Sequence, residues 1–183
     1  IILAIAIFAG SIMYQGRAVE PLTFDELRPL PPSFSADFRP GDVMVSVEGV
    51  ALDNPDRYEL VPVEERLTYT IERDGRVMEV EGPYFYPPAV QSVTPRSAAD
   101  DADIKVDDVV TAIDGEPVFA FVQLQELVAR ADGAPLVFTI WRDGELMEKT
   151  IAPRRWDLPL PAGGCETRWL IGVTGTTLFD PAV

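Results

Sequence analysis

The sequence predicts an α+β chain in which one small module, a sheet with a single helix, occurs twice. Residues 38–51, FRPGDVMVSVEGVA, share a turn, an Asp, alternating valines and an acidic-Gly pair with residues 104–117, IKVDDVVTAIDGEP. Residues 67–81, LTYTIERDGRVMEVE, then match residues 136–150, LVFTIWRDGELMEKT, at 8 of 15 positions. Two matches that recur at nearly the same offset indicate a duplicated module.

The chain begins with an uncharged segment, residues 1–13, IILAIAIFAGSIM. A helix of this length reaches about 20 Å, which is less than the roughly 30 Å of a membrane's hydrocarbon core. The segment also has no basic start of the kind that a secretory signal needs. We expect residues 1–16 to be the C-terminal part of a transmembrane helix that is completed by residues before Ile1.

Each copy then contains two segments with the pattern of strands. The apolar residues of 42–47 and 108–113 are mostly β-branched, and those of 67–71 and 136–140 alternate with a period of two. Both patterns are typical of half-buried strands. Arg-Asp-Gly follows each alternating segment, and Asp-Gly favours a tight hairpin turn because both residues tolerate positive φ. A hairpin is therefore predicted to close each copy.

One amphipathic helix is predicted between the strand pairs of the second copy. Gly133 follows it and is suited to a left-handed cap. In the first copy the corresponding stretch is shorter, and Pro62 would end a helix there after a turn or two. The apolar face of the predicted helix consists of Phe121, Leu124, Leu127, Val128 and Ala131.

Composition excludes several classes of function. The net charge is −15, so nucleic acid and anionic lipid headgroups would both be repelled. The chain has no histidine, which excludes Ser-His-Asp and Cys-His catalysis and every His-ligated metal site. Its one cysteine, Cys165, cannot form a disulfide within the chain. Acidic pairs such as Asp100–Asp101 are interpreted as solvated loop charges, so we expect no catalytic residue and no metal site.

The second copy resembles a known domain in its motifs and their order. Residues 93–99 read V-T-P-R-S-A-A, residues 107–115 read D-D-V-V-T-A-I-D-G, and one helix and an R-D-G hairpin follow. This order resembles the circularly permuted PDZ domain of bacteria. The resemblance implies two tandem PDZ domains of this type, at residues 20–82 with a shortened helix and at residues 83–156. Residues 157–183 would be an extracytoplasmic tail that leads back to the membrane.

The sequence departs from this family at four positions in turns, where the family often has glycine. Arg96, Asp103 and Asp107 occupy these positions in the second copy, and Asp37 occupies a further one in the first copy. Asp adopts the left-handed conformation more cheaply than most residues other than glycine. We therefore expect the turns to keep their shape at some cost in stability.

Two PDZ copies directly after an apolar run resemble the extracytoplasmic region of the site-2 protease family, which includes the regulator of sigma-E protease. The resemblance implies a parent enzyme of the bacterial inner membrane that cuts substrate helices within the bilayer. Such an enzyme binds zinc through H-E-x-x-H and the Asp of L-D-G, and neither motif occurs in this sequence. The chain itself would then carry no cofactor, with zinc held by the parent and the PDZ pair on the periplasmic side.

The family's binding mode predicts a peptide groove in the second copy. PDZ domains add a peptide strand to a sheet edge beside the helix. Residues 84–88, which contain two prolines, are interpreted as the loop that would hold a terminal carboxylate, and each proline removes one N–H donor. Carboxylate capture is therefore not expected. The predicted groove consists of the edge residues Ala89, Val90, Gln91, Ser92 and Val93 and the helix residues Leu124, Leu127 and Val128.

These features predict a regulatory region that filters substrates for regulated intramembrane proteolysis. Large folded substrates would be excluded until another protease trims them. The expected partners are a trimmed single-span membrane protein, such as an anti-sigma factor of a stress response, and the bilayer through residues 1–16. No nucleic-acid partner is expected.

Two other parents remain open. Periplasmic heat-shock proteases carry PDZ copies after a trypsin-like domain, although without an apolar run before the first copy. A membrane-anchored adaptor without a protease would use the same domains to recruit partners. Catalysis by carboxylates within the chain is disfavoured, because glycosidases and aspartic proteases hold their carboxylate pair in a defined cleft and two small modules predict none.

Overall fold

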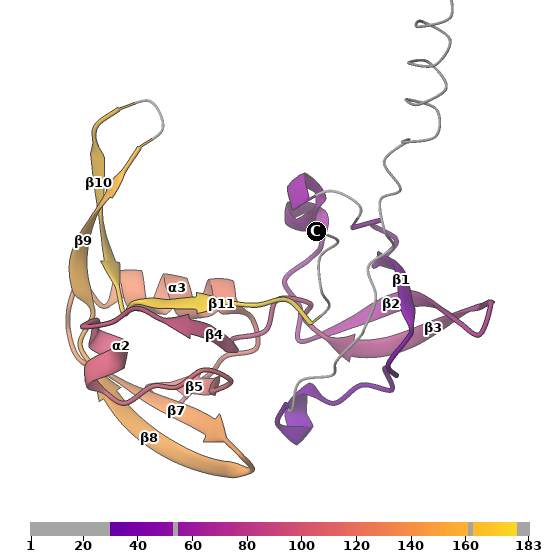
Figure 1. Cartoon of the computed structure of the whole chain (residues 1–183), viewed down its shortest axis with the longest axis horizontal. Coiled ribbons are helices and arrows are strands. Elements are labelled where there is room, and N and C mark those ends of the chain that lie inside the picture. The colour runs from indigo at the N-terminus through magenta and orange to yellow at the C-terminus, as the bar shows by residue number, and fades with distance from the viewer. Residues whose placement is uncertain (1–29, 53–54, 161–162, 179–183) are drawn as a thin grey trace, which may run out of the picture.

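The computed structural model describes residues 30–52, 55–160 and 163–178. They form two units that lie side by side, a first unit of residues 30–83 and a second unit of residues 84–175 (Figure 1). The predicted transmembrane segment, residues 1–16, lies outside this part of the chain. Among the residues described, no helix has the length and apolar character needed to cross a bilayer.

The first unit is a three-stranded antiparallel sheet with two short 3₁₀ helices. Its strand order follows the chain, β1-β2-β3. The shortened helix expected in this copy is a 3₁₀ helix that ends two residues before Pro62. The elements are η1 (Pro32–Phe34), β1 (Val43–Val47), η2 (Pro55–Leu60), β2 (Arg66–Arg73) and β3 (Arg76–Pro83).

The second unit is larger and contains three sheets. Its main sheet has the order β6-β5-β7-β8, and the two-stranded sheets pair β9 with β10 and β4 with β11. The elements are β4 (Val90–Val93), α2 (Ala98–Asp101), β5 (Val109–Ile113), β6 (Glu116–Pro117), α3 (Phe121–Arg130), β7 (Leu136–Arg142), β8 (Glu145–Ile151), β9 (Arg154–Pro159), β10 (Cys165–Leu170) and β11 (Val173–Gly175).

The second unit extends past the boundary predicted at residue 156. After β8 the chain forms the β9–β10 hairpin, and β11 then returns to pair antiparallel with β4, with Val173 opposite Val93. Residues 157–160 and 163–175 are therefore part of the folded unit, which corrects the prediction of a tail from residue 157. The pairing joins strands 80 residues apart in the chain, so no local sequence pattern revealed it.

The two units share the same local geometry in their central strands. The ladder between β1 and β2 has an irregularity between Met44 and Ser46, and the ladder between β5 and β7 has one between Val110 and Ala112. The two bulges are 66 residues apart in the chain and occupy equivalent positions in the two units. Of the positions expected to be left-handed, Arg96, Asp103 and Asp107 have positive φ. Asp37 does not, which corrects the expectation for the first copy.

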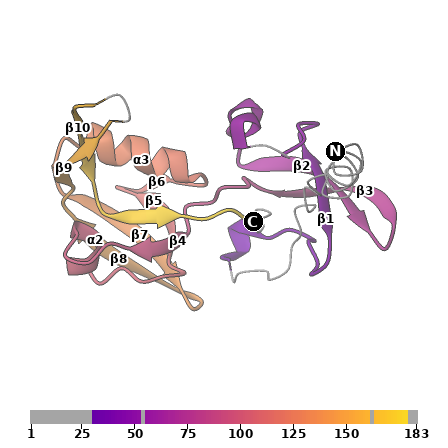
Figure 2. The same ribbon diagram turned by 45° about the horizontal axis from the view of Figure 1, so that its top comes forward.

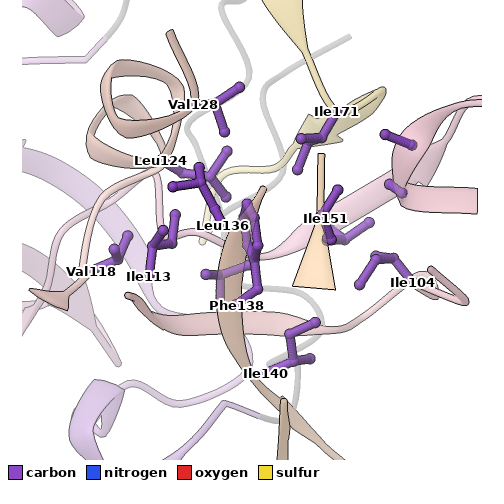
Figure 3. Close-up of a cluster of buried hydrophobic side chains, with 14 residues drawn as sticks. Ile104, Ile113, Val118, Leu124, Val128, Leu136, Phe138, Ile140, Ile151 and Ile171 are labelled. Carbon is purple, nitrogen blue, oxygen red and sulfur yellow. The ribbon is translucent and has the colours of Figure 1, made fainter. Parts of the chain in front are cut away.

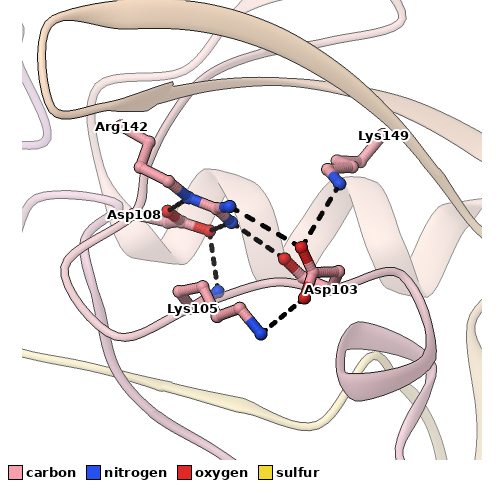
Figure 4. Close-up of polar contacts among 5 residues, drawn as sticks. All are labelled: Asp103, Lys105, Asp108, Arg142 and Lys149. Carbon is pink, nitrogen blue, oxygen red and sulfur yellow. Dashed lines mark hydrogen bonds and ion pairs between the residues drawn. The ribbon is translucent and has the colours of Figure 1, made fainter.

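Each unit also contains one bidentate ion pair between a buried Asp and an Arg at the end of a strand. Arg142 Nε and Nη2 donate to the two Asp108 oxygens at 2.6 and 2.8 Å, and the Lys105 N–H donates to Asp108 at 2.8 Å (Figure 4). Arg73 makes the equivalent bonds to Asp42 at 2.8 and 2.7 Å. Because charge-assisted bidentate bonds are strong and directional, the pair fixes the turn against the strand.

Asp42 makes the stability of the first unit depend on pH. The hydrogen bonds from Arg73 lower the pKa of the Asp42 carboxyl below its ordinary value, with the Arg39 N–H and both arginine charges acting in the same direction against burial. A carboxyl of lowered pKa stabilises the fold above its unfolded pKa of about 3.9, and this contribution is lost as the pH falls toward the folded pKa. We expect the difference in unfolding free energy between wild type and Asp42→Asn to be largest near pH 6. Urea titrations followed by circular dichroism should show it shrinking below about pH 4, and a constant difference would contradict this.

The core of the second unit lies between α3 and the main sheet. From α3, Leu124 and Val128 point toward Phe138 of β7, and Ile171 approaches from the segment before β11 (Figure 3). The predicted apolar face of the helix is buried at Phe121, Leu124 and Val128 and partly buried at Leu127 and Ala131. Burial of these side chains holds α3 at a fixed distance from the sheets, which determines the space beside it.

Candidate peptide-binding groove

A small pocket lies along α3 in the second unit. Its volume is about 50 Å³. It is bounded by the helix on one side and by the end of β10 and the start of β11 on the other. None of its lining side chains is titratable, and the polar side-chain groups among them are the Gln125 amide and the Trp169 indole N–H. The lining residues are Phe121, Leu124, Gln125, Val128, Trp169, Leu170, Ile171, Gly172 and Val173.

The strand beside α3 is β11, whereas the sequence had predicted β4. Figures 1 and 2 show β11 between α3 and β4, and β11 pairs with β4 on its other edge. The ring of Phe121 lies so close to Gly175 that a Cβ there would be 2.6 Å from it. Because β4 is already paired on this edge, the strand that borders the helix and offers backbone groups to a peptide is β11.

The predicted groove residues are therefore divided between two places. Leu124 and Val128 line the pocket, while Leu127 is partly buried against the core. The predicted edge, Ala89 to Val93, supports β11 from behind: Ser92 Oγ lies 2.7 Å from Thr174 Oγ1. On the opposite side of this segment, Ala89 forms a bridge with Val109. These five residues position the groove and do not line it.

The loop that enters β11 consists of Ile171 and Gly172. Its carbonyls are turned toward the body of the unit, since the Ala99 N–H donates to Ile171 O and the Thr94 N–H donates to Gly172 O, each at 2.8 Å. Within the described chain the N–H groups of Ile171 and Gly172 donate to no backbone carbonyl. Consecutive unpaired N–H groups in a turn form a concave site for an anion such as a carboxylate.

The loop assigned from the sequence has a different role. Phe85 is buried in the core of the first unit, and Tyr86 O accepts a hydrogen bond of 3.0 Å from the N–H of Phe121 at the start of α3. The prolines of residues 84–88 therefore remove no donor from the groove. The loop that was missed had one signal in the sequence, a glycine between apolar residues in Leu-Ile-Gly-Val.

The arrangement can bind a ligand, and it offers no chemistry for a reaction. The pocket contains no nucleophile, acid or base. Among the residues that the structure describes, no three His, Cys, Asp or Glu side chains gather where they could hold a metal ion. A strand edge, an apolar pocket and free N–H groups together match the requirements for adding a peptide strand.

Residues 90–142, which run from β4 to the end of β7, match the PDZ domain family model. Two bacterial proteins, each named "Putative zinc metalloprotease", are similar over the same region. Atu1380 of Agrobacterium fabrum is 33% identical over 86 residues, which cover 47% of this chain and 23% of that protein. BMEI0829 of Brucella melitensis is 34% identical over 84 residues, which cover 44% of this chain and 22% of that protein.

These comparisons confirm the predicted resemblance to zinc metalloproteases that carry a PDZ domain. The matched part of the chain spans less than a quarter of the length of these relatives. Among solved structures, the solution structure of GtR34C from Geobacillus thermodenitrificans is 25% identical and covers 43% of this chain and 85% of its own, with a TM-score of 0.34.

Proposed function

We propose that the chain is the substrate-filtering region of a membrane-embedded zinc metalloprotease of the site-2 type. The observation that carries the proposal is the PDZ match at residues 90–142 together with 33% identity to a zinc metalloprotease over 86 residues. In this proposal zinc and the catalytic residues belong to other parts of the parent. The region stands on the periplasmic side of the inner membrane and admits trimmed single-span substrates.

The first unit acts in this proposal as a reduced PDZ domain, the first of a tandem pair. Its bulge and its Asp42–Arg73 ion pair, equivalent to those of the second unit, support a common origin. The position of β11 at the end of the second unit supports the circularly permuted order. In the described residues the first unit has only the 3₁₀ helix η2 where the second has α3. It therefore contributes bulk and negative charge, and among its described residues it has no counterpart of the pocket beside α3.

The second unit binds the C-terminal end of a peptide. The peptide would pair with the free edge of β11, place its last side chain in the pocket against Leu124 and Val128, and direct its carboxylate to the N–H groups of Ile171 and Gly172. A protease that trims a substrate creates a new C-terminus, so this groove would distinguish a trimmed substrate from an intact one. Blocking the terminal carboxylate by amidation is expected to weaken binding about tenfold or more, because charged hydrogen bonds in an apolar site contribute strongly.

The filter is tested by deletion in the parent enzyme. Removing residues 30–178 should allow cleavage of a substrate that retains its folded extracytoplasmic domain. Removing residues 30–82 alone measures how much of this exclusion comes from the bulk of the first unit. Unchanged rejection of the intact substrate by both variants would contradict the proposal. The coding sequence on either side provides a second test, since H-E-x-x-H upstream and L-D-G downstream are expected. An adaptor without a protease would have neither motif.

A further inference from the structure

One tryptophan packs against the turn that follows α3, at one end of the groove. Trp169 Nε1 donates a hydrogen bond of 2.7 Å to Asp132 Oδ1, in the turn that follows α3. The next residue, Gly133, has a φ of +87°, and a Cβ there would lie 2.5 Å from the Trp169 ring. The guanidinium carbon of Arg155 is 5.9 Å from the ring centroid. The indole is thus held by a hydrogen bond and by close packing on bare backbone.

This tryptophan limits the space in which a peptide's last residue would lie. Trp169 lines the pocket next to the loop that carries the free N–H groups of Ile171 and Gly172. At the other end of the helix Phe121 packs on Gly175 of β11. The pocket between these ends measures about 50 Å³. A water molecule needs roughly 10–15 Å³ on such a measure, and sites for small organic molecules have about 300–1,000 Å³, so this pocket has room for a few heavy atoms.

We infer that Trp169 is a specificity-determining residue that restricts the groove to peptides ending in a small apolar side chain such as Ala or Val. This inference rests on the proposed peptide-binding function. An aromatic or long terminal side chain would have to displace the indole, which the Asp132 hydrogen bond and the Gly133 contact oppose. A charged terminal side chain would lose its hydration against Leu124 and Val128 without gaining a partner.

A purely structural role for Trp169 makes a different prediction. If the ring only packed the turn after α3, its truncation would lower stability and would weaken all peptides to the same extent. If the ring sets the size limit, its truncation enlarges the pocket and improves binding of large terminal residues. Improved binding cannot come from a variant that fails to fold, so the two roles are separable by relative affinity.

The test uses the full chain and four fluorescein-labelled decapeptides, GSGSTVTVTX, in which X is Ala, Val, Leu or Phe. Fluorescence anisotropy should show that wild type prefers X = Ala or Val over X = Phe by about tenfold or more, the scale on which pockets discriminate by size. Trp169→Ala should bind the Phe peptide about tenfold more tightly than wild type does. Asp132→Ala keeps the ring but removes the acceptor of its hydrogen bond. This variant should prefer X = Ala or Val over X = Phe by only a few-fold. Trp156→Ala, in β9, is the matched control and should keep the wild-type preference.

The outcomes separate this inference from the proposed function. If wild type and variants bind none of the four peptides, or bind their amidated forms equally well, the peptide-binding function is contradicted. If wild type binds the free carboxylate forms with no preference by size, or if Trp169→Ala keeps the wild-type preference, the role of Trp169 is contradicted while the groove's function stands.

Discussion

Arg142→Met is expected to lower the free energy of unfolding of the second unit by about 3–5 kcal/mol, the usual cost of removing one partner from a buried ion pair. Asp108 has no exposed surface, and both of its oxygens accept bonds from Arg142. Methionine retains most of the apolar stem and provides no charge. The loss is large because the carboxylate would remain buried with only the Lys105 N–H as a donor. Urea unfolding followed by tryptophan fluorescence measures it.

Tryptophan fluorescence is specific to the second unit, because Trp141, Trp156 and Trp169 are the only tryptophans of the chain. Arg73→Met, the equivalent change in the first unit, is therefore the matched control and should shift this signal less. The double variant Asp108→Asn with Arg142→Met removes the stranded charge and should recover more than half of the loss. A loss below about 1 kcal/mol in the single variant would show that the pair contributes no more than a surface ion pair does.

The occurrence of the Asp–Arg ion pair in both units indicates that its role is structural. Asp42–Arg73 and Asp108–Arg142 have the same bidentate geometry. The bulges beside them are equivalent as well. The pocket beside α3 lies in the second unit, whereas the ion pair occurs in both units. The pair therefore belongs to the folding scaffold, in which it fixes the turn before the first strand against the end of the next, and it has no direct part in binding.

The parts of the fold that local patterns encode could be predicted from the sequence. The alternating residues of β2 and β7 and the Asp-Gly turns after them specify hairpins within a few residues. The apolar face of α3 follows from its 3.6-residue period. Leu124 and Val128, which are four residues apart and so lie on one face, are buried. These predictions hold because strand alternation and helical periodicity depend on neighbours close in the chain.

The groove could not be predicted in the same way, because it depends on which strand pairs with β4. That partner, β11, is three residues long and lies 80 residues further along the chain. Any extended segment can satisfy an open edge with backbone hydrogen bonds, so the sequence of β4 does not specify its partner. The prediction placed residues 89–93 at the open edge since no nearby strand was available to cover it. Once β11 is in place, the loop that precedes it becomes the candidate carboxylate site.

Gly172→Ala tests this loop most directly and is expected to remove peptide binding. Gly172 has a φ of +88°, and a Cβ there would lie 2.3 Å from the Cβ of Ser97, which is fully buried. Left-handed strain and overpacking together are expected to cost about 2–5 kcal/mol. Relief of the overlap would move the loop away from α2 and would displace the N–H groups of Ile171 and Gly172.

Gly144→Ala provides the matched control for this variant. Gly144 lies in the β7–β8 turn with a φ of +91°, and a Cβ there would meet no atom within 4 Å. It should therefore show the strain alone, about 1–2 kcal/mol, with peptide affinity unchanged. For Gly172→Ala we expect a loss of affinity of at least about tenfold for carboxylate peptides, measured by anisotropy at a temperature where circular dichroism shows both variants folded. If a folded Gly172→Ala binds as tightly as Gly144→Ala does, the N–H groups of this loop do not hold the carboxylate.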